Sequence, residues 1–214
     1  SLPGRQRPTK DAADMTRARA NFLLLVAAAI WGFAFYFHKV VIAEIGPIQF
    51  VAGRAILASL CIAPVALWEL RGGKRVSPGL LLYAALSGAV FFLAGILHQA
   101  GFETATVTSS GFLTSLYVVA TPILAWIFLR RLPPVYVWPA LFLALCGTWL
   151  LGGGSLSGLT WGDRIIAFSA IFWGAQMLVT AVASERYGLP FTFSCLQFAA
   201  VAILAVPSAF VFED

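Results

Sequence analysis

The sequence predicts an all-α integral membrane protein, a polytopic bundle of helices that cross a lipid bilayer. Hydrophobic residues make up 60% of the chain and charged residues only 11%, and the mean hydropathy is +0.89. A water-soluble domain carries roughly 25% charged residues, because its surface must be wetted. The apolar residues also fall into runs of about 20, which is the length that an α-helix needs to span a membrane.

Seven segments are long and apolar enough to form spanning helices. Short stretches rich in glycine, proline and charge separate them, as expected where helices end and begin. None of the segments has a polar face for water, which argues against a soluble bundle of seven buried helices. The predicted spans are 22–43, 48–69, 79–99, 107–129, 134–151, 164–184 and 190–212.

Lysine and arginine lie in alternate connections between these spans. They precede the first span and follow the second, fourth and sixth, whereas the loops 44–47, 100–106 and 152–162 contain neither residue. Because cytoplasmic loops carry the excess of Lys and Arg, the N-terminus is predicted to lie in the cytoplasm. The net charge of +5 is thus spread along the chain rather than gathered on one face. The expected partner is the lipid bilayer, and no nucleic acid is expected.

The N-terminal residues 1–14 are polar, aperiodic and contain proline. They are predicted to be a disordered tail or sequence upstream of a true start at Met15. The apolar run that follows is longer than the 7–15 residues of a signal-peptide core, so a retained helix is favoured. Three cysteines without metal-ligand spacing lie within apolar runs, which favours burial over a metal site, and no cofactor is expected. They are Cys61, Cys146 and Cys195.

Part of the chain is repeated in the opposite orientation. AAIWG at 28–32 matches SAIFWG at 169–174, and an offset of 143 relates Pro47 to Pro190, Arg54 to Gln197 and Pro64 to Pro207. Since five helices lie between the start of one copy and that of the other, the second copy enters the membrane from the opposite side, which defines an inverted repeat. The repeat predicts a tail at 1–14, a first unit at 15–152, a linker at 153–163 and a partial second unit at 164–214.

These segments resemble the EamA family of the drug/metabolite transporter superfamily. The resemblance covers about residues 15–214 and rests on the order of AAIWGFAFYFHK, FVAGRAILAS, TSSGFLTSLYVVATPILAWIF and GDRIIAFSAIFWG. It implies ten helices in two inverted five-helix repeats, of which seven are present, in a chain truncated after the second helix of repeat two. The family usually has Glu where this chain has Arg131.

The resemblance also implies a function. Members export small metabolites, commonly amino acids, across the bacterial inner membrane, so the expected partner is a small-molecule substrate and the expected mechanism is alternating access. The oligomeric state is left open, with a homodimer among the options. A carrier of nucleotide sugars or organophosphates, from the same superfamily, would need more cationic groups than this chain offers.

An intramembrane enzyme is the alternative from another class of function. The segment SSG at 109–111 is the nearest imitation of a rhomboid serine site. It lacks the preceding glycine, however, and both histidines lie upstream of it. Paired carboxylates and metal-ligand clusters are also missing from the sequence. A transporter without enzymatic activity is therefore favoured.

Two cations and two histidines interrupt the apolar runs. Lys39 and Arg54 are predicted to lie at similar depth, in the outer third of the bilayer, where burying a charge is costly. They could line a wet cavity and bind an anionic group such as a substrate carboxylate. Alternatively, Lys39 snorkels to the interface and Arg54 ties helix ends together. His38 and His98 are candidate proton carriers, or simply hydrogen-bonded residues near the interface.

Polar and aromatic side chains at helical spacing indicate which helix faces line a cavity. Four hydroxyls share one face of 107–129, where they can line a path or bond neighbouring helices. Tryptophans at membrane depth need a partner for the indole N–H, which favours inward positions. The candidate substrate-binding residues are Trp31, Phe35, His38, Lys39, Arg54, His98, Ser110, Thr114, Tyr117, Thr121, Trp173, Gln176, Thr180 and Gln197.

Overall fold

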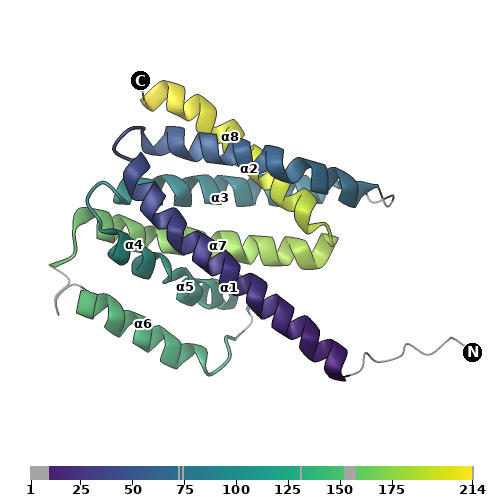
Figure 1. The fold of residues 1–214 in the computed structure, drawn as a ribbon, viewed down its shortest axis with the longest axis horizontal. Helices are drawn as coiled ribbons and strands as arrows, with labels where there is room; N and C mark the ends of the chain where they lie inside the picture. The colour runs from purple at the N-terminus through teal and green to yellow at the C-terminus, as the bar shows by residue number, and fades with distance from the viewer. Residues whose placement is uncertain (1–9, 72, 74, 131, 152–157, 214) are drawn as a thin grey trace, which may run out of the picture.

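The computed structural model describes residues 10–71, 73, 75–130, 132–151 and 158–213. Every regular element among these residues is a helix, which confirms the predicted class (Figure 1). Six segments are long and apolar enough to cross a membrane, and α4 and α5 together make one of them. The helices are α1 (Lys10–Val41), α2 (Pro47–Leu70), α3 (Pro78–Gly101), α4 (Val107–Thr114), α5 (Tyr117–Leu129), α6 (Val137–Leu151), α7 (Trp161–Tyr187) and α8 (Pro190–Phe212).

Several of the predicted boundaries differ from the structure, and three differences concern a whole span, the tail and the linker. The span expected at 134–151 begins only at Val137, so α6 has 15 residues and is shorter than the roughly 20 that a spanning helix needs. Helix α1 begins at Lys10, so the last five residues of the predicted tail are helical, while 1–9 lie outside the described residues. Of the linker predicted at 153–163, residues 153–157 lie outside the described residues, and residues 161–163 belong to α7.

The span predicted as one helix at 107–129 is broken in its middle. The amide of Leu116 bonds to the carbonyl of Leu113, and that of Val118 to Ser115, so the bonds here are of the tighter 3₁₀ type. Pro122 lies within the first turns of α5 and has no N–H for the carbonyl of Val118. The break separates the hydroxyl-rich half of this span from its apolar half.

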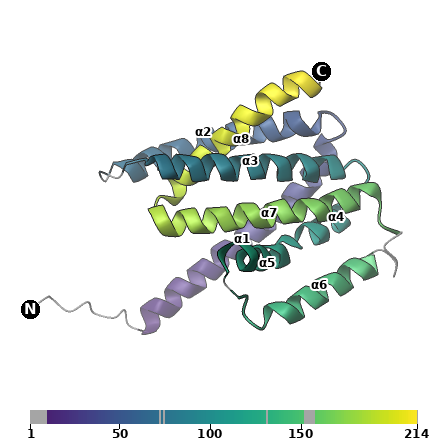
Figure 2. The ribbon, with the colours of Figure 1, turned by 180° about the vertical axis from the view of Figure 1, so that it is seen from behind.

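The helices run in directions that agree with an inverted repeat. The start of α2 contacts the end of α8 and the end of α2 contacts its start, so these two helices are antiparallel. Helices α3 and α7 are antiparallel too, since Gly101 lies against Gly162 and Gly79 against Tyr187. Lys39, near the end of α1, bonds to the end of α3, so α1 and α7 also run in opposite senses. In Figures 1 and 2, α2, α3 and α7 lie side by side and α1 and α8 cross them obliquely.

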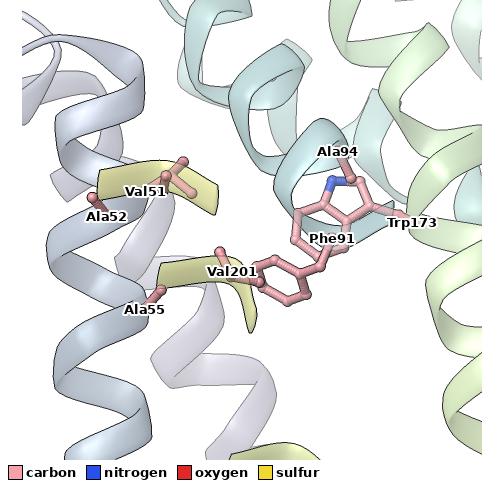
Figure 3. Packing of buried hydrophobic residues seen from close by; sticks show 8 residues of the cluster. Val51, Ala52, Ala55, Phe91, Ala94, Trp173 and Val201 are labelled. Atoms are coloured by element: carbon pink, nitrogen blue, oxygen red, sulfur yellow. The ribbon is translucent and has the colours of Figure 1, made fainter. Parts of the chain in front are cut away.

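The largest apolar cluster joins α2, α3, α7 and α8. Figure 3 shows Phe91 of α3 against the indole of Trp173 of α7, with small residues of α2 beside Val201 of α8. The ring centroids of Phe91 and Trp173 are 4.8 Å apart and meet edge to face, the geometry that aromatic pairs prefer. In a bilayer, small residues at such interfaces let helices approach closely. The members of the cluster are Val51, Ala52, Ala55, Phe91, Ala94, Trp173, Val201 and Ala205.

A buried carboxylate joins α7 to α4. Asp163 closes a capping box with Thr160: its carboxylate accepts from the Thr160 amide at 2.9 Å and from the Thr160 hydroxyl at 2.8 Å. Its other oxygen accepts from the hydroxyl of Ser109 in α4. Asp163 is 5% exposed, so these bonds replace water at the start of α7.

Replacing Asp163 with alanine is expected to lower the free energy of unfolding by about 2–3 kcal/mol, because α7 loses the carboxylate half of its capping box and the hydroxyls of Ser109 and Thr160 lose a charged acceptor. Thermal unfolding of the protein in detergent measures the change. Glu103→Ala is the matched control, since Glu103 is exposed and its hydrogen bonds to other described residues are made by its backbone groups. Equal unfolding temperatures of the two variants would contradict the role of Asp163.

Candidate functional site

A cavity of about 180 Å³ lies among α1, α2, α3, α4 and α7, toward the end of the bundle where α1 ends and α7 begins. This cavity is more enclosed than the other pockets described on the protein. Seven of the candidate residues predicted from the sequence line it, together with Ala34. Those seven are Trp31, Phe35, His38, Arg54, His98, Thr114 and Trp173.

Arg54 brings a positive charge to this cavity without a carboxylate partner. Its Nη1 lies 3.4 Å from Nε2 of His38, and its guanidinium lies over the rings of Phe50 and Phe91, 5.6 Å from each centroid. Among the residues that the structure describes, no carboxylate pairs with it. A cation in the membrane is expensive, and cation–π contacts offset only part of the cost. The charge is therefore available to a ligand.

The two histidines contact each other, and the rings of both contact that of Phe35. Their ring centroids are 5.7 Å apart, and the ring of Phe35 lies 5.6 Å from that of His98. Nε2 of His98 is 2.9 Å from the hydroxyl of Thr114, whose hydrogen goes to the carbonyl of Ser110 at 2.7 Å. The hydroxyl of Thr114 therefore accepts from Nε2–H of His98, which fixes the tautomer of that ring.

The guanidinium of Arg54 can only donate, so Nε2 of His38 accepts from it and the neutral ring carries its proton on Nδ1. Nδ1 of His38 and Oε1 of Gln99 are both buried, and neither has a partner in the part of the chain that the structure describes. The first is a donor and the second an acceptor. The two residues are neighbours, since Gln99 Nε2 donates to the carbonyl of His38 at 3.1 Å.

The indole N–H of Trp173 is the most informative unpaired group of the cavity. It is buried and has no acceptor among the described residues, although Trp173 is only 4% exposed. A buried donor without a partner costs free energy comparable to a lost hydrogen bond. The side chain that carries this unpaired N–H and the side chain of Arg54 both line the same small cavity. Such a space suits a ligand with negatively charged acceptor atoms.

Lys39 does not line the cavity. Its Nζ donates to the carbonyl of Phe102 and, at 3.3 Å, to that of Glu103, just past the end of α3. Lys39 thus ties the ends of α1 and α3 together, which is the role predicted for Arg54 rather than the snorkelling predicted for Lys39. A cation near the C-terminal end of a helix also interacts favourably with the helix dipole.

Three further candidates gather one to two turns away, beyond the Phe91–Trp173 pair. The amide oxygen of Gln197 accepts from Ser87 at 2.8 Å and from Nε2 of Gln176 at 3.1 Å, and the hydroxyl of Thr180 lies 3.4 Å from it. Gln197 is the position that the repeat relates to Arg54. These side chains bond to one another across α3, α7 and α8 and do not line the cavity, and Oε1 of Gln176 finds no partner among the described residues.

The hydroxyl stripe of 107–129 divides in the same way. Thr114 faces the cavity, whereas Ser110 is fully buried and bonds to the carbonyl of Thr106 at 2.7 Å. Thr121 bonds to the carbonyl of Tyr117 at 2.7 Å, and its hydroxyl lies 3.5 Å from the carbonyl of Gly174. Tyr117 packs against the largest apolar cluster. One hydroxyl of the stripe thus lines the cavity, and others bond within their own helix or lie close to a neighbouring helix.

Sequence reasoning missed Phe91, Ser87 and Gln99. Phe91 is one of 18 phenylalanines, and nothing in its sequence context distinguishes it. Ser87 and Gln99 could have been found, because each is a polar residue within the apolar run 79–99 and needs a partner in a membrane.

Comparison with known proteins agrees with this architecture. The EamA-like transporter family matches residues 18–153. A protein of Archaeoglobus fulgidus described as an uncharacterized transporter is 29% identical over 199 residues, which cover 92% of this chain and 60% of that protein. The chain thus spans less than two thirds of the length of this relative. With more than half of its residues matched by the family, the chain belongs to the EamA-like transporter family.

Proposed function

We propose that the protein is a secondary carrier that exports small organic solutes with a carboxylate group, such as amino acids, by alternating access. Membership of a transporter family supports the general activity. The observation that carries the proposal is Arg54, which lies at the cavity with no carboxylate partner among the described residues, near the unpaired indole N–H of Trp173. A substrate carboxylate would satisfy both groups.

The proposed setting is the cytoplasmic membrane of a bacterium, with the N-terminus inside. The connections after α2, α5 and α7 lie at one end of the bundle, the end at which α1 begins, and Arg71, Arg75, Arg130 and Arg186 lie there or next to it. That distribution is typical of a cytoplasmic face. The opposite directions of α1–α2 and α7–α8 support alternating access, because inverted repeats provide two exchangeable conformations.

Counterflow in proteoliposomes tests the proposal with the full-length protein. Vesicles loaded with unlabelled alanine are expected to accumulate radiolabelled alanine transiently, as only a carrier with an alternately exposed site does. Ethylamine, which lacks the carboxylate of alanine, should not exchange. A protein that exchanges ethylamine as fast as alanine, or that gives no counterflow with any carboxylated solute tried, would contradict the proposal.

Trp173→Phe is expected to weaken substrate binding about tenfold, because one hydrogen bond to a charged acceptor is lost. Stability should change little, since the indole N–H has no partner to lose among the described residues and a phenyl ring keeps the contact with Phe91. The KM of counterflow and the unfolding temperature separate the two effects. Trp161→Phe, at a site that is 70% exposed, is the control. An unchanged KM in the Trp173 variant would show that the indole N–H does not bind the substrate.

A further inference from the structure

Helices α2 and α8 both begin without a cap from their own side chains. Each has proline in its first turn, and neither Gly46 nor Leu189, which precede the prolines, provides a side-chain hydrogen bond. Helices α3, α4 and α7, in contrast, are capped by Ser77, Thr106 and Thr160. The first N–H groups of α2 and α8 therefore need acceptors from elsewhere.

A glutamate at the end of the partner helix supplies the acceptors in both cases. Glu213 follows α8 and accepts from the N–H of Ile48 at 2.9 Å and from that of Gln49 at 2.8 Å. Glu69, in the last turn of α2, accepts from the N–H of Thr192 at 2.8 Å and from its hydroxyl at 2.8 Å. Each carboxylate also meets the positive end of a helix dipole, which strengthens these bonds.

The contacts of Glu213 with α2 and of Glu69 with α8 occupy equivalent positions in the internal repeat. The offset of 143 that relates Pro47 to Pro190 also relates Gln49 to Thr192, and the two glutamates differ from it by one residue. The contacts are thus one interaction made twice, at opposite ends of an antiparallel helix pair. Two unrelated surface contacts would have no reason to follow the repeat.

The glycine at the start of α2 is a second sign that the carboxylate belongs there. A Cβ atom added to Gly46 would lie 2.3 Å from Cδ and 2.4 Å from Oε2 of Glu213. Any larger residue at this position would therefore push the carboxylate away from the helix. The absence of a side chain at Gly46 leaves the space that Glu213 occupies.

Between these ends, α2 and α8 contact each other through small residues. Ala52 and Ala55 of α2 and Ala205 of α8 are buried in the shared cluster. Oγ of Ser59, near the middle of α2, lies 3.8 Å from Sγ of Cys195 in the second turn of α8. The pair is therefore held at both ends by charge-assisted bonds and closely packed between them.

We propose that Glu69 and Glu213 are paired latches that hold α2 and α8 together as one body throughout transport. Access to the cavity then changes through movement of other helices against this pair. The capping itself is independent of the proposed function, whereas the persistence of the pair during transport depends on it.

Two mutant cycles test the latches through stability alone. Gly46→Ala is expected to lower the unfolding temperature by about 2–6 °C in the parent protein. The same substitution should have no effect in Glu213→Ala, where no carboxylate is left to displace. Thr192→Val should likewise be costly in the parent and nearly neutral in Glu69→Ala. Glu44→Ala, at an exposed glutamate nearby, is the control. Strictly additive effects in both cycles would overturn the latches.

A cross-link tests whether the pair stays together. In a Cys61→Ser, Cys146→Ser background, Ser59→Cys places a thiol next to Cys195, and copper phenanthroline should oxidise the two to a disulfide. The oxidised full-length protein is expected to keep its counterflow rate. If oxidation abolishes counterflow and a reductant restores it, α2 and α8 do not stay together as one body during transport. If the two thiols fail to react, the contact between positions 59 and 195 is contradicted. A protein that is inactive even when reduced would contradict the carrier function instead, and the mutant cycles would still decide the latches.

Discussion

Arg54→Gln is expected to abolish transport while leaving the protein folded. The guanidinium can give a substrate carboxylate two charge-assisted hydrogen bonds, worth about 1.5–3 kcal/mol each, so the Kd should rise by a factor of about 100 or more. The same change removes a charge that has no carboxylate partner among the described residues. The unfolding temperature should therefore stay the same or rise, because an uncompensated charge in the membrane is costly.

Arg164→Gln is the matched control for this experiment. Arg164 lies on α7 with its side chain exposed, and it does not line the cavity, so its loss should leave counterflow unchanged. Arg54→Lys should be intermediate, because an ammonium keeps the charge but not the planar fork of donors that matches a carboxylate. Normal counterflow by a well-expressed Arg54→Gln variant would reduce Arg54 to a structural role. It would also remove the main support for a carboxylated substrate.

The sequence predicted the helices well because each is a long apolar run that only a bilayer can solvate. It failed at the ends and at the break, where single hydrogen bonds decide the outcome. The turn at Leu116 depends on 3₁₀ bonds and on the missing N–H of Pro122, and the surrounding run is apolar enough to suggest one straight helix. Helix α6 begins three residues later than predicted, because residues 135–136 form a turn in which the amide of Val137 bonds to the carbonyl of Pro134 at 2.9 Å.

The sequence predicted which polar and aromatic residues need partners in the membrane, but not which of them line the candidate site. Polar residues within apolar runs must find partners, so Arg54, His38 and Trp173 were identifiable from the sequence. Which partner each finds depends on how the helices pack. Lys39 was equally conspicuous, yet it binds carbonyls at the end of α3, and Gln197 joins a separate hydrogen-bonded group. Sequence periodicity gives the face of a helix but not the neighbour that it meets.

Glycine positions add a constraint that composition alone does not reveal, namely how closely two backbones approach. At the junction of α3 and α7, a Cβ on Gly162 would lie 2.0 Å from the carbonyl oxygen of Gly101 and 2.9 Å from the amide nitrogen of Ala105. Both obstacles are backbone atoms, so no side-chain rotation relieves them. The same contact sets the distance between His98 on α3 and Trp173 on α7, which both line the cavity.

Gly162→Ala is therefore expected to cause the largest loss of stability of any single methyl group added to the described helices. Overpacking typically costs about 1–3 kcal/mol and more where the backbone must move, so the unfolding temperature should fall by at least about 5 °C. Gly53→Ala is the control, because a Cβ there meets no atom within 4 Å and alanine favours the helix. Scanning fluorimetry in detergent compares the two. If Gly162→Ala unfolds at the temperature of the parent, α3 and α7 do not approach as closely as the structure shows, and the cavity between them must be wider.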